Sequence, residues 1–212
     1  MNLHLPEKFR PRFLMTTAGV LLCAGAVGFF KCSLFGVDPF QCFAQGVWGH
    51  FFEGSLSYGT YYTFLSLLFL LADLILDRHY IGIATFVNMF LTGYIVDFSV
   101  SMINRFCPAP DLLMRILFLA IGVVVMCFAS SLYMTSDLGV SVYDAIPIVI
   151  SNRSHAPFKF CRIGCDLICV AIGTASGLLP GLGTLITAFF MGPLVDFFNR
   201  RFSRPLLERQ KA

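Results

Sequence analysis

Six apolar stretches, most of them long enough to cross a lipid bilayer, constrain the fold of this chain more than any other feature. A transmembrane helix needs about 20 largely apolar residues. The stretches are 13–35, 56–76, 81–103, 112–135, 158–179 and 181–198. Hydrophobic residues make up 57% of the 212 residues and charged residues only 13%, about half the charged share of a soluble domain. We therefore predict an all-α membrane protein with about six transmembrane helices in contact with the lipid bilayer.

The basic residues at the two chain ends orient these spans. The first stretch is preceded by Lys8, Arg10 and Arg12, and the last is followed by Arg200, Arg201, Arg204, Arg209 and Lys211. Basic flanks favour the cytoplasmic side of a membrane. Both termini are therefore predicted to be cytoplasmic, in a multi-pass protein of a bacterial inner (plasma) membrane, with Cys107 on the outer side. The net charge of +3 is too small and too scattered to predict a nucleic-acid partner.

The order of glycines, threonines and acids repeats within the chain. Arg12, Gly19, Gly36 and Val37 recur at one constant offset as Arg115, Gly122, Gly139 and Val140, and Thr85 and Asp97 recur at a slightly shorter offset as Thr184 and Asp196. Such self-similarity indicates an internal duplication. The predicted layout is a cytoplasmic basic tail at 1–11, a first repeat at 12–106, a linker at 107–111, a second repeat at 112–204 and a second basic tail at 205–212.

The number of spans in each copy sets the symmetry that relates the copies. Three spans is an odd number, so consecutive copies must enter the membrane from opposite sides. The prediction is two inverted-topology three-helix repeats, related by a pseudo-two-fold axis in the membrane plane. Secondary transporters commonly use this architecture and place their solute site near the midplane, at the interface of the repeats.

Two repeated motifs carry a resemblance to a known family. Each first span is followed by Gly-Val-x-x-Phe/Tyr, at Gly36–Phe40 and Gly139–Tyr143, and each copy closes with Gly-x-x-Thr and then Gly-x-x-x-Asp-Phe, ending at Phe98 and Phe197. Over most of residues 12–200 the chain resembles the YczE/YitT family of largely uncharacterised bacterial membrane proteins. The resemblance implies a multi-pass plasma-membrane protein, of a kind sometimes labelled a transporter, and it supplies no substrate.

The segments that begin at Gly36 and Gly139 are the strongest candidates for a solute site. Each is apolar enough to dip into the bilayer but too short to span it, and paired interrupted segments mark the site in inverted-repeat transporters. Asp38 and Ser141 are predicted to cap short helices, whose N-termini favour an anionic solute group. The predicted ligand-binding residues are Asp38, Gln41, Ser141, Tyr143 and Asp144. The alternative is a pair of interfacial connecting helices without a ligand.

The repeated acids and threonines are predicted coupling or ion-binding residues. Asp97 and Asp196 lie within apolar stretches, where acids usually face a partner or a water-filled cavity. An alternative is placement at the membrane end, with pairing to Arg105 and to the basic residues 200–204. For Thr85 and Thr184 the favoured alternative is helix capping.

The remaining polar and aromatic residues receive structural interpretations. Arg162 and Asp166 have the spacing of a same-face helical ion pair, and Asp73 lies near the end of its span. Trp48, Tyr58, Tyr61 and Tyr62 are predicted interface anchors. The eight cysteines are predicted to be structural, because they mostly lie in apolar stretches and none has zinc-ligand spacing.

The function predicted from these features is a secondary transporter or facilitator of a small solute. The alternative is a membrane accessory or scaffold protein that supports a partner enzyme or complex. No catalytic motif is present, so an enzyme is not predicted, and neither is a metal or cofactor. Self-association into a homo-oligomer is left open.

Overall fold

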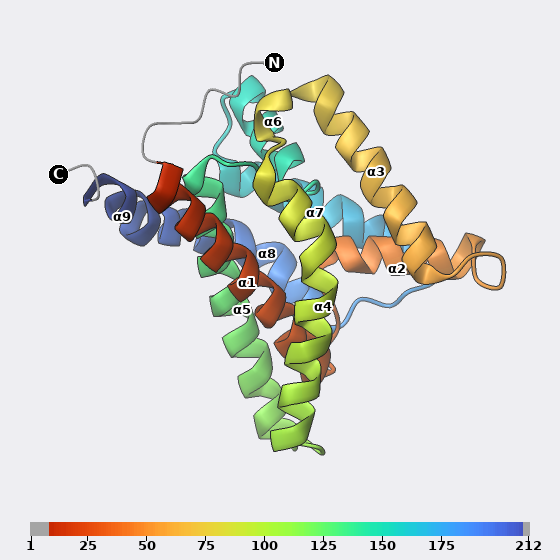
Figure 1. Cartoon of the computed structure of the whole chain (residues 1–212). Coiled ribbons are helices and arrows are strands. Elements are labelled where there is room, and N and C mark those ends of the chain that lie inside the picture. Colours follow the sequence, from red (N-terminus) through yellow and green to blue (C-terminus); the bar gives the residue numbers. More distant parts are fainter. Residues whose placement is uncertain (1–8, 210–212) are drawn as a thin grey trace.

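Helices make up nearly all of the described chain. The computed structural model describes residues 9–209, apart from the burial and contacts of 83, 84, 87, 89–91, 93 and 209. In order, the elements are α1 (Phe9–Ser33), α2 (Pro39–Phe51), α3 (Tyr58–Leu76), the 3-10 turn η1 (Arg78–Tyr80), α4 (Ile83–Phe106), α5 (Leu112–Ser136), α6 (Ala145–Ser154), α7 (Phe158–Ala175), α8 (Leu182–Phe198), the π-helical η2 (Asn199–Ser203) and α9 (Arg204–Arg209) (Figure 1). Since residues 9–209 contain no strand, the predicted all-α class is confirmed.

In the part of the chain that the structure describes, four helical segments are long and apolar enough to cross a membrane. They are Phe9–Ser33, Tyr58–Leu76, Leu112–Ser136 and Leu182–Glu208. The outer face of α3 carries exposed Phe64, Leu68 and Leu71, an apolar surface suited to lipid rather than to water. The prediction of a membrane protein in contact with the bilayer is confirmed. The helices α4 and α7, which would complete the predicted six spans, fall outside this group of four.

The first helices of the two predicted copies, α1 and α5, pack against each other in antiparallel orientation. Their end contacts are reciprocal. Arg12 donates a hydrogen bond to the carbonyl oxygen of Ser136 (3.0 Å), and Arg115 donates one to the carbonyl oxygen of Ser33 (3.0 Å). Each arginine at the start of one helix thus stabilises the end of the other.

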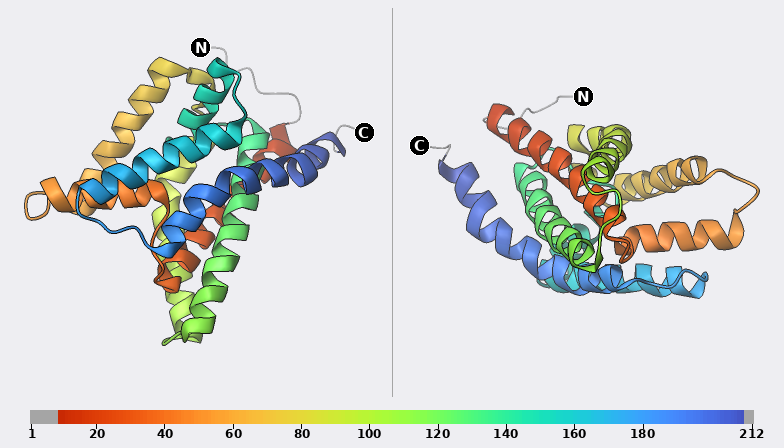
Figure 2. Two further views of the ribbon diagram at one scale, coloured as in Figure 1. Left: turned by 180° about the vertical axis from the view of Figure 1, so that it is seen from behind. Right: turned by 90° about the horizontal axis from the view of Figure 1, so that it is seen from below.

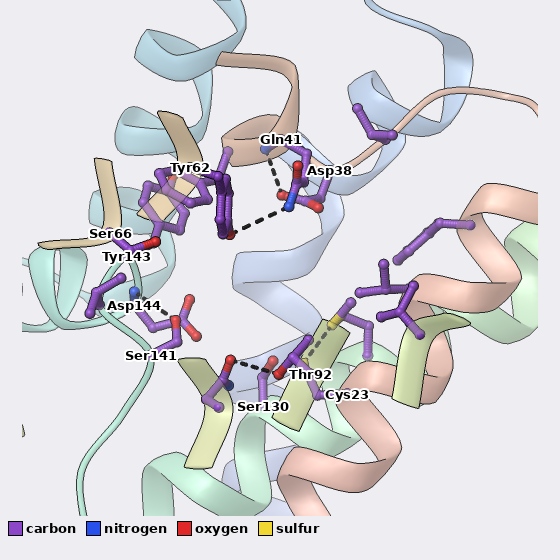
Figure 3. Close-up of a pocket in the computed structure, with 18 of the residues that line it drawn as sticks. Cys23, Asp38, Gln41, Tyr62, Ser66, Thr92, Ser130, Ser141, Tyr143 and Asp144 are labelled. Carbon is purple, nitrogen blue, oxygen red and sulfur yellow. Dashed lines mark hydrogen bonds between the residues drawn. The ribbon is translucent and has the colours of Figure 1, made fainter. Parts of the chain in front are cut away.

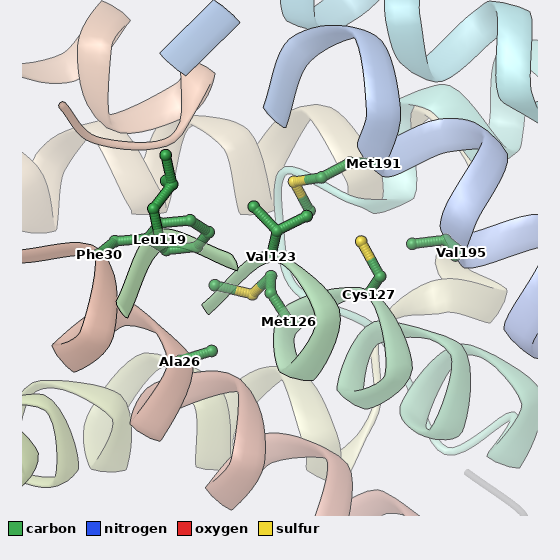
Figure 4. Close-up of a cluster of buried hydrophobic side chains, with 8 residues drawn as sticks. All are labelled: Ala26, Phe30, Leu119, Val123, Met126, Cys127, Met191 and Val195. Carbon is green, nitrogen blue, oxygen red and sulfur yellow. The ribbon is translucent and has the colours of Figure 1, made fainter. Parts of the chain in front are cut away.

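The middle of this helix pair repeats the same exchange. A Cβ added to Gly19 would lie 3.0 Å from the carbonyl oxygen of Ala129, and one added to Gly122 would lie 3.5 Å from that of Ala26. Small residues at such positions let membrane helices approach closely. The apolar core continues from this contact onto α8, where Met191 and Val195 join side chains of α1 and α5 (Figure 4).

The ends of the helices divide the molecule into two sides. The start of α1 and the helix α9 lie at one end, and the 107–111 connection between α4 and α5 lies at the opposite end (Figures 1 and 2). The short helices α2 and α6 follow α1 and α5, where the sequence predicted re-entrant or interfacial segments. The predicted basic tails at 1–11 and 205–212 lie partly outside the described residues.

Candidate functional site

A cavity of about 460 Å³ lies among the helices and is bordered by both predicted copies (Figure 3). Its walls come from α1 to α5, from the turn before α6, and from single residues of α7 and α8. All five predicted ligand-binding residues line it, and Thr85 and Asp97 line it as well: the set is Asp38, Gln41, Thr85, Asp97, Ser141, Tyr143 and Asp144. This volume falls within the range of small-molecule sites.

Two glycines in the left-handed backbone region direct the chain towards this cavity. Gly36 has a φ of 112° and Gly139 a φ of 102°, backbone angles that residues other than glycine rarely adopt. A Cβ on Gly36 would lie 2.7 Å from Oγ1 of Thr184, and one on Gly139 would lie 2.9 Å from Oγ1 of Thr85. Each glycine therefore permits both a sharp turn and a close contact with the other copy.

The repeated threonines hold these turns in place. Thr184 donates a hydrogen bond to the carbonyl oxygen of Val37 (2.6 Å), and Thr85 donates one to that of Val140 (2.7 Å). Thr85 also accepts from the backbone nitrogen of Gly82 and so caps α4, as one alternative predicted. Thr184 makes no such cap. An ion-binding role for either threonine stays a prediction.

The N-termini of the two short helices differ from each other. Asp38 caps α2 as predicted, because its carboxylate accepts from the backbone nitrogen of Gln41 (3.1 Å). The prediction that Ser141 caps the second short helix is wrong. Its hydroxyl accepts from the backbone nitrogen of Asp144 (3.3 Å), in a turn that delays the start of α6 to Ala145. Both helix starts nevertheless place an aspartate carboxylate beside the cavity.

A buried charge network forms the wall around Asp144. Arg162 on α7 pairs with Asp144 and, at 3.1 Å, with Asp166. Tyr133 donates to Asp144 and Tyr143 donates to Asp166. All five side chains are more than nine-tenths buried. The predicted pair of Arg162 with Asp166 is confirmed, and partners on α5 and before α6 extend it.

The opposite wall carries a neutral polar chain. Tyr58 donates to Oε1 of Gln41 (2.7 Å), whose amide nitrogen donates to the hydroxyl of Tyr62 (3.4 Å). The ring of Phe40 stacks on that of Tyr143 with centroids 4.8 Å apart, which joins this wall to the charged one. Tyr58 and Tyr62 therefore line the cavity, while their role as interface anchors stays a prediction. The signal of this position in the sequence is the spacing of Tyr58 and Tyr62, which are four residues apart and share one face of α3.

The two repeated acids lie in different settings. Asp97 lines the cavity with an exposed side chain. Asp196 lies away from it and pairs with Arg200 one helical turn later (3.0 Å), which is the alternative predicted for it. A further acid, Asp73 on α3, is buried, and its Oδ1 makes no hydrogen bond within the described part of the chain. Among the described residues, no cluster of metal-ligating side chains is present.

Comparisons with known proteins place the chain among membrane proteins of unknown function. A family model described as "Family of unknown function (DUF6198)" matches residues 10–200. The "Uncharacterized membrane protein YczE" of Bacillus subtilis is 23% identical over 88% of this chain and 84% of its own length. An "Uncharacterized protein" of Haemophilus influenzae is 26% identical over 58% of this chain and 56% of that protein, and "Uncharacterized protein YyaS" of Bacillus subtilis is 20% identical over 94% and 98%. No solved structure matches. The predicted resemblance to YczE is confirmed.

Proposed function

Because this chain belongs to the DUF6198 family, whose function is unknown, we propose a function from its own cavity: it moves a small solute across a bacterial inner membrane as a secondary transporter or facilitator. The observation that carries this proposal is that both predicted copies line the cavity. One wall contains the residues that follow the Gly36 turn, and the other contains the residues that follow the Gly139 turn. Polar and ionisable side chains within a membrane protein usually mark a solute or ion pathway.

Two inverted-topology repeats would give this cavity a way to open on either side. Antiparallel α1 and α5 exchange their contacts, with Arg12 on Ser136 and Arg115 on Ser33. An exchange of this kind between antiparallel neighbours fits a two-fold axis perpendicular to the helices. If α1 spans the bilayer, that axis lies in the membrane plane, as in inverted-repeat transporters. Rocking of one copy against the other would then open the cavity to alternate sides.

Six spans follow when α4 and α7 are added to the four apolar segments. Of the three charged residues of α7, Arg162 and Asp166 pair inside the protein rather than facing lipid, and Lys159 lies in the first turn of the helix. The basic chain ends then place both termini in the cytoplasm. The 107–111 connection, with Cys107, lies at the end opposite α9 and would face the outside (Figure 1).

A test of this proposal needs no knowledge of the solute. In a variant without native cysteines, Ser66→Cys places one thiol in the cavity, because Ser66 lines it from α3. A membrane-impermeant thiol reagent, applied to intact cells or to inside-out vesicles, should label this thiol from both sides. A matched variant that keeps only Cys107 should be labelled in intact cells alone.

The alternative function gives a different pattern. An accessory or scaffold protein needs no exchange of access, so its cavity thiol would react from one side or from neither. Labelling from a single side, in protein that elutes as a monodisperse peak, would contradict transport. Labelling of Cys107 only in inside-out vesicles would contradict the proposed orientation.

A further inference from the structure

The inner walls of the cavity carry more negative than positive groups. Arg162 is the one cation of the buried network, and it faces two carboxylates, those of Asp144 and Asp166. Asp38 adds a third carboxylate, which forms no ion pair within the described part of the chain. At the exposed edge of the cavity Lys31 and Asp97 offset each other formally. A solute inside the cavity therefore meets a surplus of carboxylates.

The helix N-termini that would otherwise attract an anion already face acidic side chains. The carboxylate of Asp38 accepts a hydrogen bond from the backbone amide of Gln41, in the first turn of α2. Asp144 stands at the start of α6. Arg162, which could also attract an anion, is enclosed by its own two carboxylates and is only 6% exposed. An anionic solute would have to displace these groups, whereas a cation would add to them.

Aromatic rings complete a surface suited to an organic cation. Phe40, Tyr58, Tyr62, Tyr133 and Tyr143 all line the cavity. The faces of such rings attract cations, most strongly where water is excluded. One ring here already holds a cation, since the guanidinium carbon of Arg162 lies 4.8 Å from the centroid of Tyr143.

From the excess carboxylates and the aromatic walls of this cavity, we infer that its ligand is a small organic cation, an amine carried as a protonated or quaternary ammonium group. The ammonium lies near Asp38 and Asp144, and its apolar substituents lie against Phe40 and Tyr62. The cavity of about 460 Å³ accommodates a molecule of this class rather than a bare ion. As a statement about transport, this inference rests on the proposed function, whereas binding does not depend on it.

The experiment compares ligands that differ in charge but hardly in shape. Choline, its neutral isostere 3,3-dimethylbutan-1-ol and the anion 3,3-dimethylbutanoate are titrated into the purified full chain in lipid nanodiscs, followed by thermal unfolding. A ligand that binds the folded state raises the unfolding temperature. Choline, or tetraethylammonium or butylammonium tested beside it, should raise this temperature, while the neutral and anionic compounds should not. Equal shifts for the neutral compound, larger shifts for the anion, or no shift with any cation would overturn the inference.

Variants assign the effect to the cavity. Asp38→Asn retains a side chain able to cap α2 but removes its charge, so cation affinity should fall about tenfold or more, the expected size of a lost charge contact. Asp196→Asn is the matched control, because Asp196 pairs with Arg200 away from the cavity, and its affinity should be unchanged. If Asp38→Asn lowered the cation affinity by no more than twofold, in protein with unaltered thermal stability, the assignment would be contradicted.

Uptake into proteoliposomes separates this inference from the proposed function. Binding of a radiolabelled cation without its uptake would support a cationic ligand and contradict transport. Uptake that anions inhibit and cations do not would support transport and contradict a cationic ligand. Cation uptake that Asp38→Asn reduces would support both.

Discussion

Two helix contacts that the internal repeat makes equivalent are packed very differently. On one side, α2 lies along α7 with the backbones nearly touching: a Cβ on Gly46 would lie 2.7 Å from the carbonyl oxygen of Gly173, and one on Gly173 would lie 2.6 Å from that of Cys42. On the other side, α6 meets α3 over a much smaller area. The repeat offset of 103 residues aligns Gly46 with Val149, and the later offset of 99 aligns Gly173 with Leu74, so the second contact has neither glycine. We call the α2–α7 contact the closed seam and the α3–α6 contact the open seam.

The long helices of the two seams also differ in charge. On α7 of the closed seam, Arg162 and Asp166 pair with each other and with the turn before α6. The repeat places Thr63 and Leu67 at these positions of α3, where Thr63 bonds only to its own helix and Leu67 is exposed. Asp73, also on α3, is buried without a partner for Oδ1 in the described chain. The comparison teaches that α7 holds the buried charges of the closed seam, while α3 of the open seam borders the cavity with neutral side chains.

The largest expected effect follows from removing the cation of the closed seam. Arg162→Met leaves two buried carboxylates without a counter-charge, which should lower the free energy of unfolding by about 3–5 kcal/mol. Unfolding by sodium dodecyl sulfate in mixed micelles measures this change. The repeat supplies the control, Thr63→Val on α3, for which a change below about 1 kcal/mol is expected. If both variants lost the same free energy of unfolding, the buried charges of α7 would contribute no more to stability than the neutral side chains of α3.

An intermediate effect is expected from the glycine contact. Gly173→Ala introduces a Cβ against the carbonyl of Cys42 and should cost about 1–3 kcal/mol, as overpacking usually does. Gly164→Ala lies on the same helix with no neighbour within 4 Å of the added atom, so it should be neutral or slightly stabilising. The same detergent titration compares them. Similar stabilities of the two variants would mean that α2 and α7 can move apart without cost.

The smallest expected effect concerns Asp73, the buried acid on α3. Asp73→Leu removes a buried carboxylate oxygen that has no hydrogen-bond partner within the described chain. The free energy of unfolding should therefore stay unchanged or rise by up to about 1 kcal/mol, because the described residues offer this oxygen no hydrogen bond that the substitution would remove. A loss above about 2 kcal/mol in the same titration would reveal a stabilising contact for Asp73 and weaken the distinction between the seams.

Local patterns predicted the helices well, and their ends less well. The stretch 158–179 was predicted as one span, but α7 ends at Ala175 because the chain turns through Gly177 with a φ of 94°. The helix predicted at 81–103 begins two residues later, because Ile81 ends the η1 turn and Gly82 precedes α4, and it extends three residues further at its end. Apolar composition continues through such turns and does not report them.

The candidate site was predictable only where neighbours in sequence are neighbours in space. The pair of Arg162 and Asp166 follows from helical spacing, and the Asp38 cap from its place before Pro39. By contrast, the contact of Arg162 with Asp144 joins α7 to a separate turn, and no local pattern encodes it. The shift of the second short helix by a few residues, which displaced the predicted Ser141 cap, arises from a turn that the first copy lacks.

The proposed transport requires the closed seam to open while the open seam closes, so that the cavity opens on alternate sides of the membrane. Spin labels on exposed positions report both seams by double electron–electron resonance in nanodiscs: Ile75 with Ser154 across the open seam, and His50 with Ile172 across the closed one. Gly173→Ala penalises the closed seam, and a cost of about 1–3 kcal/mol changes a two-state ratio about 5- to 150-fold. We predict that this variant lengthens the His50–Ile172 distance and shortens the Ile75–Ser154 distance, while Gly164→Ala changes neither. A longer His50–Ile172 distance with an unchanged Ile75–Ser154 distance would contradict the account.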